Sequence, residues 1–171
     1  MALRPSQPAA LSIAGSDSSG GAGLQADLRT MTKLGVHGAS VVTCVTAQNP
    51  GGVSAIHPTP AKVVAAQLDS VFNSLPIRAV KTGMLYSRSI IDAVADCLAK
   101  RQRLSLVVDP VMISSSGTPL LKPSAAQALT KRLLPLAKLV TPNLNEASVL
   151  AERSVREPEA VSYTHLRAHE T

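Results

Sequence analysis

Short apolar segments alternate with amphipathic patterns along almost the whole chain, and this alternation constrains the fold more than any other feature. Apolar runs of strand length lie at 10–15, 39–45, 79–82, 106–108 and 139–141. Between them, apolar residues recur every three or four positions, which is typical of helices. These helical patterns lie at 24–34, 60–72, 90–98, 124–134 and 144–151. The order predicts βαβ units in a mostly parallel sheet with helices on both faces, a three-layer α/β/α fold.

Glycine and proline mark several boundaries between these segments. Gly35 follows the first helical pattern and is predicted to end that helix as a C-cap. The NPGG sequence at 49–52 predicts a tight turn. The segment 53–57 is too short for a helix, so we expect a flap strand there. The next helix is expected to begin at Pro60.

The composition fits one domain with a single core. The chain has 171 residues, of which 45% are hydrophobic and only 2% aromatic, so Ala, Val, Leu and Ile must form that core. The net charge of +6 comes from scattered basic residues, with small clusters only at 100–103 and 131–132. No aromatic residues interleave with these clusters to stack on bases. A solvated surface is therefore favoured over a nucleic-acid site.

The cysteines and the hydropathy pattern exclude other classes of protein. Cys44 and Cys97 are far apart and have no metal-ligand spacing. Cys44 lies in an apolar run, so we interpret it as a core residue and not as a nucleophile. No stretch approaches the roughly 18 apolar residues of a membrane span, and the N-terminus has no apolar signal core. We expect a cytoplasmic protein that binds neither nucleic acid nor a membrane.

The last residues of the chain, VSYTHLRAHET at 161–171, differ from the rest. His165 and His169 are four positions apart and could form a metal-binding pair. The string also looks like one reading frame of a transposon adapter used in sequencing libraries, and we favour this explanation. We therefore expect a partial domain over 1–160, whose C-terminal part is missing, and a non-native tail over 161–171.

Polar and glycine residues gather in the loops that follow the predicted strands. These loops lie at 16–21, 48–49, 83–84, 109–112 and 141–143. Open α/β sheets bind ligands beyond the carboxyl ends of their strands. The sequence therefore predicts a ligand site formed by these loops.

The first of these loops fits two phosphate-binding patterns only in part. GAGLQA at 21–26 matches the dinucleotide pattern G-x-G-x-x-G/A, which also needs an acidic residue about 20 positions later. No Asp or Glu occurs between Asp27 and Asp69. GSDSSG at 15–20 resembles the start of a phosphate loop, but Gly21 and Ala22 replace the required Lys and Ser or Thr. Both interpretations fail, and either a ligand-approaching glycine loop or a plain tight turn remains.

Longer motifs resemble one family. AGSDSSGGAGLQAD at 14–27 is similar to the opening signature of the hydroxymethylpyrimidine/phosphomethylpyrimidine kinases, which have the ribokinase-like fold. The resemblance continues in the family's order through VTAQN at 45–49, QLD at 67–69, KTGML at 81–85, VDPVM at 108–112 and TPNLNE at 141–146. It implies an enzyme of thiamine biosynthesis that phosphorylates a hydroxymethyl pyrimidine with ATP and Mg²⁺.

Carried over to this sequence, the resemblance implies a pyrimidine site formed by Gly15, Asp27, Gln48, Met84 and Val111. One glutamine amide can bond both the ring nitrogen and the amino group of an aminopyrimidine. Met84 and Val111 can sandwich the apolar ring. Asp27 is expected either to hold the hydroxymethyl group or to complement the dipole at the first turn of the helix.

The resemblance also implies a magnesium and phosphate side formed by Asp109, Asn143 and Glu146, acting through water. Magnesium keeps several waters and needs few carboxylates, which suits this set. The alternative for Glu146 is a capping residue that reaches back to Asn143 at a helix start. Both roles are compatible.

The family's Gly-Thr-Gly-Cys anion hole, its catalytic residue and its phosphate-contacting lysine are not in this sequence. We therefore expect the parent protein, a homodimer like many relatives, to be the active kinase and these 171 residues to be inactive. Pyridoxal or pyridoxamine kinase, of the same fold, is the alternative enzyme. A pyrimidine-binding module without catalysis is the alternative from another class.

Overall fold

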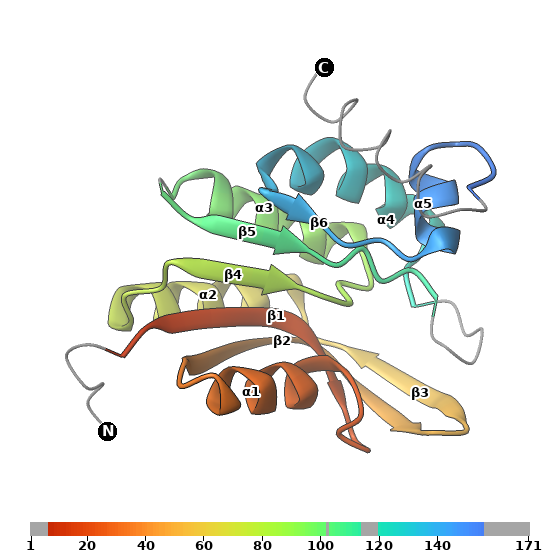
Figure 1. Ribbon diagram of the computed structural model, residues 1–171. Helices are drawn as coiled ribbons and strands as arrows, with labels where there is room; N and C mark the ends of the chain where they lie inside the picture. The colour runs from red at the N-terminus through yellow and green to blue at the C-terminus, as the bar shows by residue number, and fades with distance from the viewer. Residues whose placement is uncertain (1–6, 102, 114–119, 156–171) are drawn as a thin grey trace.

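The computed structural model describes residues 7–101, 103–113 and 120–155 (Figure 1). The predicted domain end at 160 and the tail at 161–171 lie outside these residues. A six-stranded sheet has the order β3-β2-β1-β4-β5-β6. The pairing of β2 with β3 is antiparallel and the other four pairings are parallel. The strands are β1 (Ala9–Asp17), β2 (His37–Asn49), β3 (Gly52–Pro58), β4 (Ala79–Thr82), β5 (Ser105–Val108) and β6 (Leu139–Val140).

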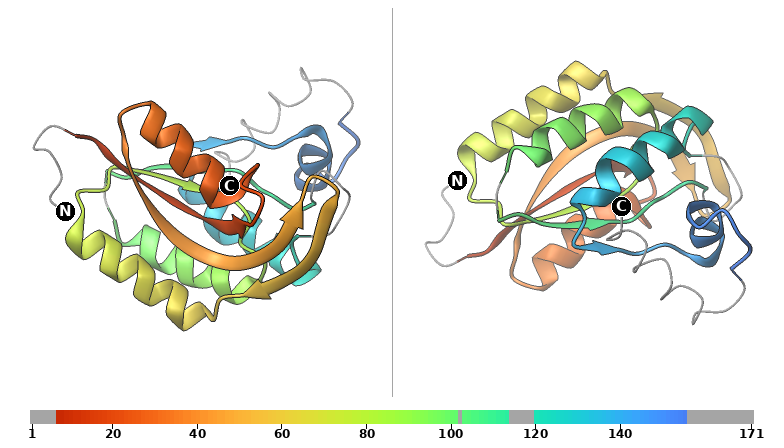
Figure 2. Two further views of the ribbon diagram at one scale, coloured as in Figure 1. Left: turned by 90° about the horizontal axis from the view of Figure 1, so that it is seen from below. Right: turned by 90° about the horizontal axis from the view of Figure 1, so that it is seen from above.

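Helices cover both faces of this sheet, as predicted. Helix α1 (Gly23–Lys33) lies on one face, over β1 and β2 (Figure 2). The opposite face carries α2 (Ala61–Ser74), α3 (Arg88–Ala99) and α4 (Pro123–Ala128). Helix α5 (Leu144–Leu150) follows β6 at the carboxyl end of the sheet. In the described part of the chain, no helix is long and apolar enough to cross a membrane.

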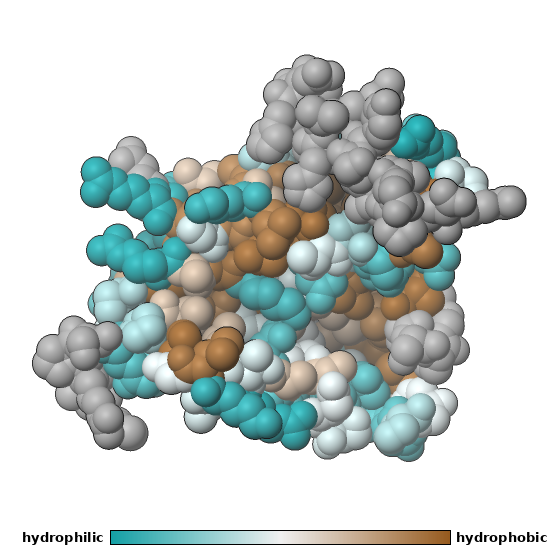
Figure 3. Space-filling view, in the orientation of Figure 1, coloured by the Kyte–Doolittle hydropathy of each residue, from teal (hydrophilic) through white to brown (hydrophobic). Residues whose placement is uncertain are grey.

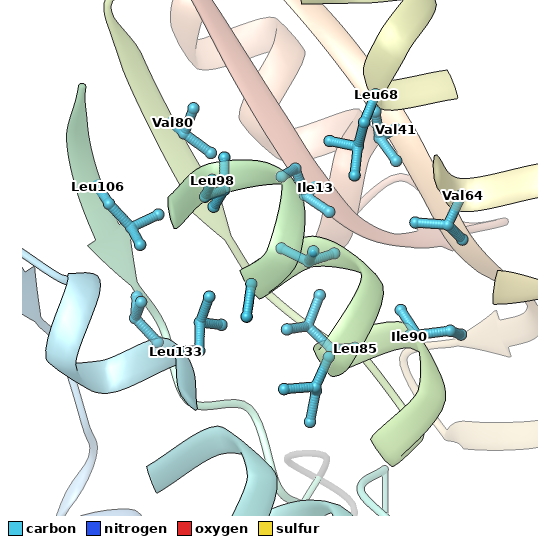
Figure 4. Packing of buried hydrophobic residues seen from close by; sticks show 14 of the residues in the cluster. Ile13, Val41, Val64, Leu68, Val80, Leu85, Ile90, Leu98, Leu106 and Leu133 are labelled. Carbon is cyan, nitrogen blue, oxygen red and sulfur yellow. The ribbon is translucent and has the colours of Figure 1, made fainter. Parts of the chain in front are cut away.

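The main core lies between the sheet and the helices of the α2–α4 layer (Figure 4). Burying one Val, Leu or Ile side chain contributes about 1.5–3 kcal/mol to the free energy of folding. Aliphatic side chains can therefore form this core although the chain has few aromatic residues. The strands and helices contribute Ile13, Val41, Val80, Leu106, Val64, Leu68, Ile90, Leu98 and Leu133, all at most 4% exposed.

Glycine ends α1 as predicted. Gly35 has φ +73 and its N–H bonds to the carbonyl of Thr32, while the N–H of Val36 bonds to the carbonyl of Met31. These two bonds form a Schellman motif, which needs the left-handed conformation that glycine adopts without strain. The turn at 49–52 and the flap strand are confirmed too, since β3 pairs with β2 as a hairpin.

The helix predicted over 124–134 is confirmed as a continuous helical segment, but it is regular α-helix only to Ala128. After α4, the chain forms the π-helical segment η1 (Leu129–Leu133) and the 3-10 turn η2 (Leu134–Leu136). Pro135 has no N–H to donate, so the regular hydrogen-bond ladder cannot continue through it. The irregular end still buries Leu129 and Leu133 in the core.

A bulge shifts the register of β1 against β2 near the carboxyl ends. Ala14 pairs with Val42 but Gly15 pairs with Cys44, so Thr43 is the extra residue. The side-chain amide of Gln67 on α2 satisfies the backbone of Val42: Oε1 accepts its N–H at 2.9 Å and Nε2 donates to its carbonyl at 3.1 Å. The bulge thereby brings Cys44 beside Gly15.

One row of paired residues crosses the sheet on the face that carries α1. Ser12 pairs with Lys81, Lys81 with Val107, and Val107 with Leu139. Helix α1 covers only the β1 and β2 side of this face, and no other described helix covers the rest. Leu139 is 45% exposed as a result, and Figure 3 shows hydrophobic surface over β5 and β6. A parallel sheet normally has both faces covered.

We predict that this uncovered face makes the 171-residue chain self-associate. The substitution Leu139→Lys should reduce association measured by sedimentation velocity, because burying this charge in the apolar face against a second copy would be costly. Leu34→Lys is the control, since Leu34 is 73% exposed but lies at the end of α1. An equal effect of the two substitutions would contradict this assignment.

Candidate functional site at the carboxyl ends of the strands

Asp17, the last residue of β1, organises the glycine-rich loop that leads to α1. Its Oδ1 accepts the backbone N–H and the hydroxyl of Ser19, both at 2.9 Å. Its Oδ2 accepts the backbone N–H of Ala22, the N-cap of α1, at 2.8 Å. A short acidic side chain that bonds to the backbone two residues later is typical of such turns. The loop is therefore fixed at the start of α1.

Asp17 is only 3% exposed. Burial by itself would raise the pKa of Asp17, but the hydrogen bonds from Ser19 and Ala22 outweigh it and hold the pKa below its ordinary value. Asp17 is thus ionised at neutral pH. Its contribution to stability is present above the pKa of the unfolded chain and is lost as the pH falls through the lower pKa of the folded state.

An apolar cluster lies beside this loop. Its buried members are Cys44, Met84 and Leu120, and Val111 packs against them. The Cys44 Sγ lies 3.7 Å from the Met84 Sδ. A Cβ at Gly15 would lie only 2.8 Å from the Cys44 Sγ. Gly15 therefore permits the close contact between β1 and this cluster. Burial raises the pKa of the Cys44 thiol, which agrees with its interpretation as a core residue.

Gln48 is the penultimate residue of β2 and lies next to the glycine-rich loop. The Ser18 hydroxyl donates to the Gln48 carbonyl at 2.7 Å and accepts the Gln48 N–H at 2.8 Å. The Gln48 side-chain Oε1 accepts the Thr46 hydroxyl at 3.1 Å. The single proton of the Thr46 hydroxyl is shared with the Ser16 carbonyl, which lies closer, at 2.9 Å. The loop after β1 and the end of β2 are thus joined, and the half-buried Gln48 amide lies at their junction.

Asp27 lies in α1 and faces the sheet. Its Oδ2 accepts the Ser12 hydroxyl at 2.5 Å, and its two oxygens lie 3.2 and 3.1 Å from the Lys81 Nζ. The prediction that Asp27 occupies the first turn is wrong, because α1 begins at Gly23 and has no acidic residue in its first turn. The helix dipole acts mainly within that turn. The position of Asp27 is therefore explained by its bonds to Lys81 and Ser12, and not by the dipole of α1.

Asp109 follows β5 directly and shares Lys81 with Asp27. The Lys81 Nζ lies 3.4 Å from the Asp109 Oδ2. Burial raises the pKa of Asp109 above its ordinary value, and the Lys81 ammonium opposes this rise only in part. One cation thus links the carboxylates of α1 and of the β5 end.

Asn143 and Glu146 form a capping box at the start of α5. The Asn143 Oδ1 accepts the Glu146 N–H and the Glu146 Oε2 accepts the Asn143 N–H, each at 2.9 Å. The capping role considered for Glu146 is therefore confirmed. Glu146 is 5% exposed, and its Oε1 accepts the Met112 N–H at 3.4 Å. This bond ties α5 to the loop after β5.

Asp109 and Glu146 supply the oxygen donors that magnesium prefers. Burial raises the pKa of Glu146, hydrogen bonds from Asn143 and Met112 offset part of the rise, and the charge of Asp109 adds to it. A divalent cation would relieve this repulsion, so the donor set fits magnesium. In the described ranges, no group of three or more His, Cys, Asp or Glu side chains forms a closed metal cage.

The structure thus brings the predicted residues together in linked groups. Met84 and Val111 belong to the apolar cluster, Gly15 lies against it, and Gln48 is bonded to the glycine-rich loop through Ser18 and pairs with Val53 of the cluster. Lys81 joins Asp27 to Asp109.

The structural roles of two residues, Asp17 and Lys81, were not predicted from the sequence. Asp17 could have been found from the Asp-Ser-Ser-Gly pattern, which favours side-chain to backbone bonds in turns. Lys81 gave only a weak signal, a single charge inside an otherwise apolar strand, and its partner Asp27 is 54 positions away.

Comparisons with known proteins identify the family. The sequence profile of the phosphomethylpyrimidine kinase family matches residues 17–170. A hydroxymethylpyrimidine/phosphomethylpyrimidine kinase of Rhizobium meliloti (strain 1021) is 54% identical over 151 residues, which are 88% of this chain and 56% of that protein. The chain spans about half the length of the curated relatives that it matches.

Solved structures give the same result. The phosphomethylpyrimidine kinase of Clostridium difficile 630 is 44% identical with a TM-score of 0.87, covering 96% of this chain and 71% of that one. The pyridoxal kinase of Staphylococcus aureus in complex with AMP-PCP and pyridoxal is 33% identical with a TM-score of 0.82, covering 96% and 59%. Among these ribokinase-like neighbours, the chain belongs to the phosphomethylpyrimidine kinase family.

Proposed function

We propose that the protein containing this chain transfers the γ-phosphoryl group of ATP to 4-amino-5-hydroxymethyl-2-methylpyrimidine and then phosphorylates the monophosphate, in thiamine biosynthesis. The observation that carries the proposal is the apolar cluster that contains Met84 and Val111: Gly15 lies against its sulfur atoms, and Gln48 pairs with Val53, which packs against the same cluster. An apolar surface with a few polar anchors is typical of a site for a small aromatic ring.

The Gln48 amide supplies the polar recognition in this proposal. Its Oε1 has a second lone pair beyond the one used by Thr46, and its Nε2 carries two donors. The amide can therefore donate to a ring nitrogen while accepting from the neighbouring amino group. The bonds of Ser18 to the Gln48 backbone hold the residue in place for this contact.

Asp27 orients the reacting hydroxymethyl group in this proposal. Its carboxylate is fixed by Lys81 and Ser12, yet its side chain is 18% exposed. A carboxylate has about four lone-pair sites, so it can still accept a hydrogen bond from a substrate hydroxyl. Holding the acceptor oxygen in one position lowers the entropic part of the barrier to transfer.

Asp109, Asn143 and Glu146 form the magnesium and phosphate side in this proposal. The two carboxylates would hold the ion through water, with Asn143 keeping Glu146 in place by the capping box. Magnesium, when bound, neutralises charge on the phosphates. ATP as the donor is supported by the similarity to a kinase solved with AMP-PCP.

Phosphoryl transfer also requires groups that stabilise charge on the moving phosphoryl. We propose that these groups lie in the remainder of the parent protein, since the 171-residue sequence has no Gly-Thr-Gly-Cys motif.

The similarity to a pyridoxal kinase favours pyridoxal as a second candidate substrate. That the complete protein is cytoplasmic and forms a homodimer stays a prediction. Light scattering can test its oligomeric state.

The direct test compares the pyrimidine and pyridoxal as substrates of the protein from the full reading frame. We expect a higher kcat/KM for the pyrimidine, because Gln48 matches an aminopyrimidine edge, and no ATP-dependent turnover by the 171 residues alone. Preference for pyridoxal would favour the second candidate. Pyrimidine binding without any turnover by the complete protein would favour a binding module.

Replacing Gln48 with Ala in the complete protein should raise the KM for the pyrimidine strongly. Losing the amide leaves substrate polar groups unpaired in the site, at a cost of roughly 1–3 kcal/mol. Gln67→Ala is the matched control, because that amide bonds only the strand backbone at Val42. The control should lower the urea-unfolding free energy and leave the KM unchanged. An unchanged KM for Gln48→Ala would remove Gln48 from the site.

Replacing Glu146 with Gln should raise the magnesium concentration needed for half-maximal rate, because one negative charge is lost. The unfolding free energy should fall only modestly, since the glutamine oxygen can still accept the Asn143 N–H, and the bond that the amide NH2 cannot replace, from the Met112 N–H, is long at 3.4 Å. Glu152→Gln, at an exposed position after α5, is the control and should change neither quantity. A large stability loss with unchanged magnesium dependence would leave Glu146 with the capping role alone.

A further inference from the structure

Lys81 contacts the carboxylates of both Asp27 and Asp109. Its Nζ lies 3.1 and 3.2 Å from the Asp27 oxygens and 3.4 Å from the Asp109 Oδ2. The side chains of Lys81, Asp27 and Asp109 are 27%, 18% and 32% exposed. This partial burial makes the pairing stronger than that of ordinary surface ion pairs.

The backbone around Lys81 fixes where its ammonium lies. Lys81 stands in register with Ser12 on β1, and Ser12 donates to the same Asp27 carboxylate at 2.5 Å. Gly83, two residues later, leaves the space that the ammonium uses, since a Cβ there would lie 3.3 Å from the Lys81 Nζ and 3.1 Å from the Ala14 Cβ. Three elements, β1, β4 and α1, therefore converge on the Asp27–Lys81 pair.

The charge balance gives Lys81 a second effect. Asp27 and Asp109 both lie within 3.4 Å of the same nitrogen, so without it two carboxylates would face each other. Like charges at such distances repel, and Asp27 would keep only the Ser12 hydroxyl as a partner. A carboxylate with one partner samples more rotamers than one held by two, and positions a substrate less well.

We propose that Lys81 is a positioning residue for the acceptor: its ammonium clamps Asp27 toward the end of β5 and so fixes the carboxylate that receives the substrate hydroxymethyl group. Lys81 itself does not touch the pyrimidine in this proposal. The inference rests on the proposed function, because it assumes that Asp27 contacts this substrate.

The test uses the complete protein with three substitutions. Lys81→Met removes the charge and keeps the length, and Lys81→Arg keeps the charge. Arg132→Met is the matched control, because Arg132 also bridges two carboxylates, Asp92 and Asp96, but on the α3 surface away from the site. Pyrimidine affinity is measured by calorimetry without ATP or magnesium, beside KM, kcat and urea unfolding. If Lys81→Met is insoluble, Lys81→Gln replaces it.

Lys81→Met should weaken pyrimidine binding roughly ten-fold or more, as expected for losing a charged hydrogen bond that fixes a binding group. KM should rise by the same factor with a smaller change in kcat, and Lys81→Arg should restore affinity to within about three-fold. Arg132→Met should leave the pyrimidine affinity unchanged and should at most lower the free energy of unfolding. Unchanged affinity in Lys81→Met, or a loss that Arg132→Met shares, would overturn the inference alone. A complete wild-type protein that binds no pyrimidine would overturn the proposed function as well.

Discussion

The parallel pairing of β1 with both β2 and β4 is the constraint on which the rest of the structure depends. Parallel strands end at the same edge, so loops that are far apart in sequence meet there. The glycine-rich loop after Asp17, the Gln48 end of β2 and the Met84 segment after β4 are neighbours for this reason. The bulge at Thr43 completes the arrangement, because it brings Cys44 against Gly15 and Met84.

The two faces of the sheet differ in a way that matters for function. One face packs Val, Leu and Ile side chains against α2, α3 and α4. The other carries small and polar side chains where α1 crosses it, and there Ser12, Lys81 and Asp27 form a connected polar group. Buried polar groups are costly unless they are paired, and Ser12, fully buried, is paired. The same group extends through Lys81 to Asp109, at the predicted magnesium side.

Much of this fold could be predicted because the signals are local. Strand β4 has the predicted bounds, and the C-cap at Gly35 follows from glycine's backbone freedom. The helix expected over 124–134 is present, but its last turns are π-helical and 3-10, next to Pro135, which has no N–H to donate. The partner of Asp27 could not be predicted, since Lys81 meets it only through strand register and the path of α1. Long-range pairing of this kind leaves no periodic trace in the sequence.

The central claim is that the apolar cluster and the Gln48 amide bind an aminopyrimidine ring. A crystal structure of the complete protein with 4-amino-5-hydroxymethyl-2-methylpyrimidine tests it most directly. We expect the ring between Met84 and Val111, the Gln48 amide on its amino edge and the hydroxymethyl group at Asp27. A ring bound away from Met84 and Val111, or one that leaves the Gln48 side chain bonded to Thr46 alone, would contradict the claim.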